Sequence, residues 1–154
     1  PWGRPDMELF KFTKGILDGK PIPVYNRGEM IRDFTYIDDI VEGVVRAVDQ
    51  PPPLDSGHEN NHNAAVRTAP YQIYNIGNGH PVPLMRYIQA LENALGKKAQ
   101  LELLPMQPGD VRATEADVSR LVSDLGYRPQ IDVETGVARF VEWYCDYYGV
   151  QLSD

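Results

Sequence analysis

Two short segments of the sequence carry side chains suited to binding a phosphorylated, hydroxyl-bearing small molecule. The first is RDFTYIDDI at 32–40, in which Arg32 lies on an extended run that leads into a helical pattern. The planar donor fork of a guanidinium matches the oxygens of a phosphate, so Arg32 is a candidate phosphate ligand. A surface ion pair of Arg32 with Asp33 or Asp39 explains the same pattern, and spacing alone favours that simpler interpretation.

The second segment is QPGDVR at 107–112. A Pro-Gly turn there would present Gln107 and Asp110 together. Their amide and carboxylate groups could hydrogen-bond vicinal hydroxyls, such as those of a ribose. Taken alone, the segment is explained equally well by an ordinary turn, which is the simpler interpretation.

A zinc-protease pattern, HExxH, occurs at 58–62. That chemistry needs a helix, because two imidazoles one turn apart must share a face while the glutamate polarises a bound water. Here the pattern lies between the prolines at 51–53 and Pro70, and both interior positions are asparagine, which disfavours a helix. We therefore predict an exposed polar loop over 51–70 and no metal site.

Gly77-Asn78-Gly79 and Cys145 each suggest chemistry that their surroundings do not support. The glycine pair lacks the third glycine, and the acidic residue about 20 positions later, that mark a dinucleotide-binding loop. It therefore predicts a turn. Cys145 lies within FVEWYCDYY at 140–148, a helical pattern, and is predicted to be a packed thiol rather than a nucleophile.

Composition bounds the class of protein. The formal net charge of −7 and the pI of about 4.9 argue against non-specific nucleic-acid binding, which needs a basic surface. No stretch approaches the roughly 18 uninterrupted apolar residues of a membrane span, and the first residues do not resemble a secretory signal. A cytoplasmic protein without membrane association is the simplest prediction. The opening PWGRPD, without an initiator methionine, suggests a fragment of a longer protein.

The chain reads as mixed α/β, with no internal repeat and no clean second domain. Apolar residues at three- and four-residue intervals predict helices at 5–18, 38–50, 84–95, 117–125 and 133–144. Asp38 and Asp39 are predicted to cap the second helix, and Gly19, Gly96 and Gly126 are expected to stop the first, third and fourth. Short apolar or alternating runs predict strands at 22–26, 30–37, 71–76 and 101–105.

Six segments, in this order, resemble the C-terminal half of the extended short-chain dehydrogenases/reductases. The segments are PWGRPDM (1–7), PIPVYNRG (21–28), RDFTYIDDIV (32–41), YNIGNG (74–79), MQPGD with the following ATEAD (106–117) and FVEWYCDYY (140–148). The branch that they resemble is the UDP-glucuronate 4-epimerase type of nucleotide-sugar epimerase. The resemblance covers nearly the whole chain outside 51–70 and implies one substrate-binding domain over 1–154.

The resemblance implies roles for residues at both ends of a UDP-sugar. Arg4 corresponds to a side chain that contacts the sugar carboxylate. Val24 and Tyr25 lie where the family holds uracil, Tyr25 by ring stacking and the neighbouring backbone by hydrogen bonds. Arg32 corresponds to the arginine that binds the pyrophosphate.

The 106–117 segment matches the family less evenly. Asp110 corresponds to a residue that binds the ribose hydroxyls, whereas Gln107 lies where related galactose epimerases have an arginine. Glu115 stands where an aromatic residue is usual, and Arg112 where a proline is common. These departures leave the identity of the sugar open.

In this family the catalytic chemistry belongs to the N-terminal half, which binds NAD through a glycine-rich unit and carries a YxxxK pair. Neither motif occurs in this sequence, so we assign no catalytic, cofactor-binding or metal-binding residue to it. The resemblance implies that the full-length protein converts UDP-glucuronate to UDP-galacturonate through a 4-keto intermediate. Another 4-epimerase, a 4,6-dehydratase, a decarboxylase or a non-catalytic nucleotide-sugar-binding module remain alternatives. We expect a full-length homodimer, and self-association of the fragment.

Overall fold

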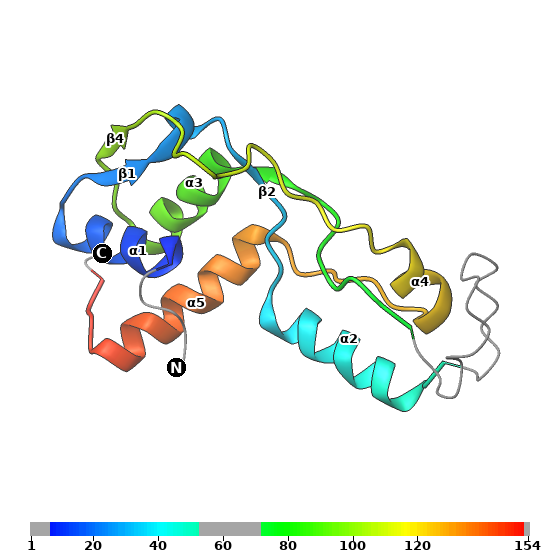
Figure 1. Cartoon of the computed structure of the whole chain (residues 1–154). Helices are drawn as coiled ribbons and strands as arrows, with labels where there is room; N and C mark the ends of the chain where they lie inside the picture. The colour runs from blue at the N-terminus through cyan, green and yellow to red at the C-terminus, as the bar shows by residue number, and fades with distance from the viewer. Residues whose placement is uncertain (1–6, 53–71, 153–154) are drawn as a thin grey trace.

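The computed structural model describes residues 7–52 and 72–152, which form an α/β fold in two groups of elements (Figure 1). In chain order the elements are α1 (Glu8–Asp18), β1 (Ile22–Val24), the 3-10 turn η1 (Tyr25–Gly28), β2 (Ile31–Arg32), α2 (Ile37–Asp49), β3 (Val82–Pro83), α3 (Leu84–Leu95), β4 (Leu101–Leu103), α4 (Ser119–Leu125) and α5 (Val133–Tyr148).

The larger group packs α1, α3 and α5 beside a two-stranded parallel sheet of β1 and β4, with Ile22 opposite Leu101. The apolar face predicted for α3 is buried, and Gly96 ends the helix in the left-handed conformation. This group shares one continuous core, made of Phe12, Ile16, Ile22, Val24, Met30, Leu84, Tyr87, Ile88, Ala90, Leu91, Leu95, Val133, Val137 and Val141.

The smaller group contains α2 and α4. Its buried core consists of Val118, Leu121 and Leu125, against which Ile76 and Tyr127 pack partly buried. Because the elements of the two groups alternate along the chain, the backbone passes between them four times, at 33–36, 77–81, 104–118 and 126–132.

Two predicted strands are wrong. The predicted strand at 30–37 is reduced to β2, because after Arg32 the backbone and side chains of Asp33 and Thr35 bond to other loops rather than to a neighbouring strand. Residues 72–76 of the predicted strand at 71–76 are not in a strand, since no other strand lies beside them in the described chain. The alternation of side chains is present in these residues, but their backbone groups have no neighbouring strand in the described chain to pair with.

The predicted cap of α2 is also wrong. The N-cap residue is Tyr36, which makes no side-chain cap, and Asp38 pairs with Arg139 at 3.4 Å. Asp39 is buried and accepts hydrogen bonds from Tyr127 Oη at 2.8 Å and from the Ile131 N–H at 2.9 Å. It therefore ties the start of α2 to the connection between α4 and α5.

The predicted helix at 84–95 is confirmed as α3, and α5 begins at Val133 as predicted but continues to Tyr148. α4 begins at Ser119 rather than 117, because Asp117 Oδ1 accepts a hydrogen bond from the Ser119 N–H in front of the helix. The predicted first turn at Pro5-Asp6, and almost all of the predicted loop at 51–70, lie outside the described residues. In the part of the chain that is described, no helix is long and apolar enough to cross a membrane.

Candidate functional site

The structure brings Arg32 and Asp110 into contact across 78 positions of sequence. A guanidinium nitrogen of Arg32 (Nη2) donates to Asp110 Oδ1 at 2.9 Å, and Nη1 donates to the carbonyls of Ile31 and Arg112 at 3.0 and 3.3 Å. The ion pair with Asp33 or Asp39 that spacing favoured is therefore wrong. The side chains of Arg32 and Asp110 are 20% and 32% exposed, so a ligand can reach the pair from solvent.

Backbone pairing explains why the two side chains meet. The Ile31 N–H donates to the Arg112 carbonyl at 3.0 Å, and the Thr114 N–H donates back to Ile31 at 3.2 Å. Residues 110–116 therefore run alongside β2. Gly109 adopts a positive φ of 83°, which lets the chain turn just before Asp110, and the Asp110 N–H closes this turn on the Gln107 carbonyl at 3.2 Å.

Val24 and Tyr25 lie next to this turn. The Val24 carbonyl accepts the Leu104 N–H at 2.9 Å, and the Arg27 N–H donates to the Leu104 carbonyl at 3.0 Å. These bonds hold η1 against the stretch that leads to Gln107. The Val24 side chain is fully buried and can contribute only through its backbone, whereas Tyr25 is half-buried and Gln107 is exposed.

The η1 turn has an unusual backbone. Asn26 and Arg27 both have positive φ, 49° and 53°, a region that side chains other than glycine rarely occupy. A Cβ added at Gly28 would lie 2.8 Å from Met85 Sδ, so η1 packs closely on α3. The turn beside Tyr25 is thus held in one shape by its surroundings, as is common where a loop forms a binding surface.

Glu8 is a member of this site that the sequence patterns did not indicate. It lies exposed in the first turn of α1, and partial desolvation of its carboxyl group raises its pKa, an effect that Arg32 opposes and Asp110 reinforces. These influences place the Glu8 carboxyl within electrostatic range of the pair. Its position directly after the PWGRPDM segment is the one signal that could have identified it. Arg4, in that same segment, lies outside the described residues.

Gly77-Asn78-Gly79 forms a packed turn, as predicted. The Asn78 N–H donates to Thr35 Oγ1 at 3.1 Å, and the Gly79 N–H donates to Asp33 Oδ2 at 3.0 Å. These amides are already bonded within the protein and are not free to bind a phosphate. Burial raises the pKa of the Cys145 thiol, which agrees with a packed thiol.

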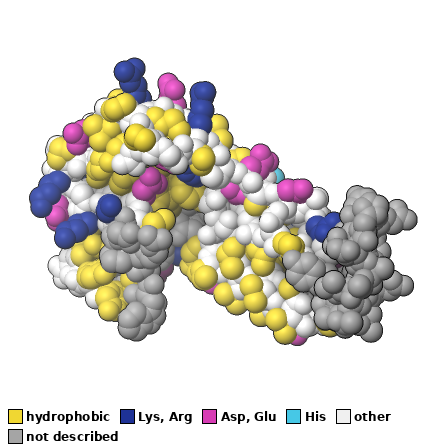
Figure 2. All heavy atoms as spheres, viewed as in Figure 1, with side chains coloured by type: hydrophobic (Ala, Val, Ile, Leu, Met, Phe, Trp, Pro, Cys, Tyr) yellow, Lys and Arg dark blue, Asp and Glu magenta, His cyan; other side chains and the backbone are white. Residues whose placement is uncertain are grey.

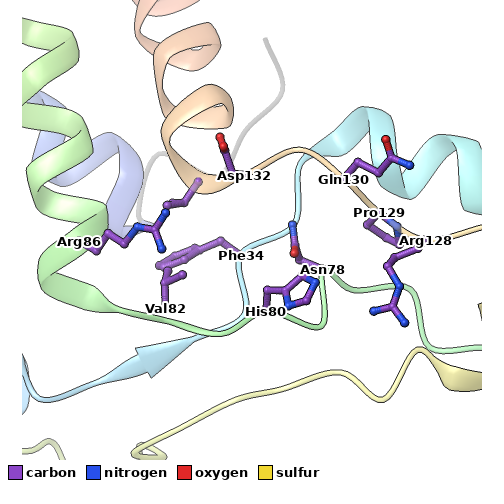
Figure 3. Close-up of a pocket in the computed structure, with 10 residues that line it drawn as sticks. Phe34, Asn78, His80, Val82, Arg86, Arg128, Pro129, Gln130 and Asp132 are labelled. Carbon is purple, nitrogen blue, oxygen red and sulfur yellow. The ribbon is translucent and has the colours of Figure 1, made fainter.

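A separate hollow of about 400 Å³ lies between the two groups of elements (Figure 3). Phe34, Val82 and Arg86 line it from the larger group, and Arg128 and Gln130 from the connection between α4 and α5. None of the described residues predicted to bind substrate lines it, so we place the candidate site at Arg32 and Asp110 instead. The charge of Arg86 is already balanced by Glu134, with nitrogen–oxygen distances of 2.6 and 3.0 Å.

Known proteins match almost the whole chain. The family model described as GDP-mannose 4,6 dehydratase matches residues 5–140. An uncharacterized 37.6 kDa protein of Escherichia coli O111:H- is 54% identical over 151 residues, covering 97% of this chain and 45% of that protein. A probable UDP-glucuronate 4-epimerase of Rhizobium meliloti is 47% identical over 150 residues, covering 96% of this chain and 44% of that protein. The chain thus spans less than half the length of these relatives.

Solved structures agree. The UDP-glucuronic acid 4-epimerase of Bacillus cereus, in complex with UDP-glucuronic acid and NAD, superposes with a TM-score of 0.72 at 28% identity, covering 94% of this chain and 42% of that one. These matches confirm the α/β fold and the resemblance of the chain to the extended short-chain dehydrogenases/reductases. The chain therefore belongs to the GDP-mannose 4,6 dehydratase family, within the extended short-chain dehydrogenases/reductases.

Proposed function

We propose that this chain supplies the nucleotide-sugar binding part of an NAD-dependent UDP-glucuronate 4-epimerase. The observation that carries the proposal is the contact of Arg32 with Asp110 at 2.9 Å, beside the turn that bears Tyr25. An arginine fork for a diphosphate, a carboxylate for ribose hydroxyls and an aromatic ring for a base are the groups that a uridine diphosphate requires.

The net charge of −7 does not oppose binding of an anionic nucleotide. Arg32 is partly desolvated at the end of β2, where its attraction for a phosphate is stronger than it would be in open water. Asp110 holds the guanidinium in place before a ligand arrives, which reduces the conformational entropy lost on binding. In this arrangement the diphosphate bonds to Arg32 while the ribose hydroxyls bond to Asp110.

UDP-glucuronate is favoured as the sugar nucleotide because the relative from Rhizobium meliloti and the structure from Bacillus cereus carry that activity in their names. Oxidation at the sugar C4 and return of the hydride to the other face require NAD and an acid–base pair, which we assign to the part of the relatives that this chain does not span. In this chain we assign contact with the sugar carboxylate to Arg4.

Calorimetric titration of UDP into the 154-residue chain tests the binding proposal. Arg32→Ala should weaken UDP binding about 10- to 100-fold, because one or two charge-assisted hydrogen bonds are lost. The matched control is Arg86→Ala, which also removes an arginine bound to a carboxylate but lies away from the site. Equal weakening by both substitutions, or no UDP binding by the unaltered chain, would remove the basis of the proposal.

The reaction itself is tested in a chimera in which this chain replaces the matching residues of the Rhizobium meliloti relative. Incubation with UDP-glucuronate should yield a product of unchanged mass that chromatographs as UDP-galacturonate. Loss of carbon dioxide would instead assign a decarboxylase, and loss of water a 4,6-dehydratase.

The setting of the protein is also part of the proposal. We assign the full-length enzyme to the cytoplasm, as a homodimer that supplies uronic acid for polysaccharide biosynthesis. The single cysteine, half-buried at Cys145, suits a reducing compartment. Fractionation of cells that produce a tagged full-length protein, followed by light scattering of the purified material, tests both assignments.

A further inference from the structure

We propose that Asp33 is a positioning residue that fixes Asp110 against Arg32 and thereby sets ribose recognition. This inference rests on the proposed function, in which Asp110 binds the ribose hydroxyls. Asp33 does not contact the Arg32–Asp110 pair through any hydrogen bond of its own side chain in the described structure. Its effect is exerted through the segment that carries Asp110.

The Asp33 carboxylate joins two loops that are far apart in sequence. Its Oδ2 accepts the N–H of Gly79 at 3.0 Å and the N–H of Ala116 at 2.9 Å. The Asp33 N–H donates to Thr114 Oγ1 at 3.2 Å. Hydrogen bonds from backbone amides to a carboxylate are charge-assisted and stronger than the bonds between neutral groups.

These contacts complete the attachment of residues 110–116 to β2. Nearer to Asp110 the segment is attached by two backbone bonds of Ile31, to Arg112 and from Thr114, and by the Arg32 side chain. Beyond Thr114 the anchor is the Asp33 carboxylate on Ala116. Without it, the far end of the segment loses its link to Asp33 and keeps its bond to the other group, from Asn75 Nδ2 to the Asp117 carbonyl at 3.2 Å. We expect the segment to shift relative to β2, so that Asp110 is held less firmly against Arg32.

Packing shows how closely the two loops meet at this carboxylate. A Cβ added at Gly77 would clash with the Ala116 Cβ and would lie 3.2 Å from Asp33 Oδ2. Glycine at 77 therefore permits an approach that any other residue would prevent. Asp33 Oδ1 is buried and has no hydrogen-bond partner in the described part of the chain, so Oδ2 carries the whole connection.

Asp39 provides a matched control in the same stretch of chain. It is also a carboxylate that accepts bonds from another loop, here from Tyr127 Oη at 2.8 Å and the Ile131 N–H at 2.9 Å. The loop that it holds leads into α5 and does not include residues 110–116. Loss of Asp39 should disturb the fold without redirecting Asp110.

The test is the ratio of the dissociation constants of 2′-deoxy-UDP and UDP, measured by calorimetry on the 154-residue chain. The unaltered chain should prefer UDP about tenfold, the usual effect of one hydrogen bond to a charged group. Asp110→Ala should bring the ratio close to one. Asp33→Ala should reduce it at least threefold, whereas Asp33→Asn, which keeps one acceptor oxygen, should restore most of the preference. Asp39→Ala should leave the ratio unchanged.

A purely structural role for Asp33 would weaken binding of both nucleotides equally and keep the ratio at its original value, which would overturn the inference. If Asp33→Ala does not fold, Thr114→Val removes only the Oγ1 acceptor and should lower the ratio by a smaller factor. An unchanged ratio in that variant and in Asp33→Asn would equally overturn the inference. Failure of the unaltered chain to prefer UDP would instead contradict the ribose-binding role of Asp110, and with it the proposed function.

Discussion

The two groups of elements differ in how much of their apolar surface they bury. In the larger group the apolar faces of α1, α3 and α5 meet one another in a single core, and Leu91 and Ile16 are almost completely buried. In the smaller group α2 turns a row of aliphatic side chains to solvent (Figure 2). The exposed fractions are 60% for Ile37, 51% for Val41, 48% for Val44, 48% for Val45 and 74% for Val48.

Helices of both groups carry an apolar face in the sequence. Whether that face is buried depends on whether another element of the described chain packs against it. Positions 37, 41, 44, 45 and 48 lie on one face of a helix, the spacing that normally indicates a core-facing surface. Exposed rows of this kind are typical of protein contact sites. Helical periodicity thus identifies the face that needs covering, and it does not say whether the same chain covers it.

The largest expected effect compares the two cores directly. Leu91→Ala removes a fully buried side chain from the larger core and should lower the free energy of unfolding toward the upper end of roughly 2–5 kcal/mol. Leu121→Ala, equally buried, should cost toward the lower end of that range, because the sparser surroundings can relax around the cavity. Chemical denaturation measures both changes, and equal losses would contradict the contrast between the cores.

A smaller effect is expected at the N-terminus of α5. Asp132 Oδ1 accepts the Thr135 N–H at 2.8 Å, and this hydrogen bonding lowers the pKa of Asp132. Asp132→Ala should reduce the free energy of unfolding by about 1 kcal/mol. Because the folded-state pKa is below that of the unfolded chain, the stabilisation is present above the unfolded value of 3.8 and is lost as pH falls through the folded value. The difference in the free energy of unfolding between Asp132→Ala and the unaltered chain should therefore disappear at acid pH. Urea titrations at several pH values would measure it.

A few-fold change in the affinity for UDP is expected when Glu8 is replaced. Its raised pKa means that the charged form is disfavoured in the folded protein, so its contribution to stability falls as pH rises through and above the ordinary value of 4.5. At neutral pH the charged carboxylate would also repel a diphosphate held by Arg32. Glu8→Gln should therefore bind UDP a few-fold more tightly at pH 7 and show a smaller gain at pH 5. Glu142→Gln, on the exposed side of α5, is the control and should change neither affinity.

The smallest effect on stability, and the sharpest test of the contrast between the groups, concerns the α2 face. Val45→Lys with Val48→Glu should change the free energy of unfolding by no more than about 0.5 kcal/mol, since both side chains are exposed. The same double substitution should reduce self-association of the chain in light scattering across a concentration series. A chain that stays monomeric at high concentration before any substitution would contradict the prediction of self-association.

Helices could be predicted from the sequence because their apolar residues lie on a local repeat and their ends at glycines. The stops at Gly19, Gly96 and Gly126 are confirmed, each in the left-handed conformation. Strands could not be predicted as well, because a strand depends on a neighbour elsewhere in the chain. The alternation at 72–76 is genuine, and no described strand lies beside it.

In the candidate site, too, the sequence identified individual residues but not their contacts with distant parts of the chain. Residue type and resemblance identified Arg32 and Asp110, and the structure brought them together. Spacing suggested the wrong partner for Arg32, since the true partner lies 78 positions away. The bonds made by Asp33 and Asp39 to distant loops leave no periodic signal, and the sequence suggested a surface ion pair for Asp33 and a helix cap for Asp39.

The alternation of the chain between the two groups has a consequence for any attempt to separate them. Neither group is a continuous stretch of sequence, because α2 and α4 are each entered from the larger group and left toward it. A protease that cuts one exposed bond cannot release either group as an intact piece. Truncation from either end removes strands or helices of the larger core before it isolates the smaller one, so neither group can be obtained alone by shortening the chain.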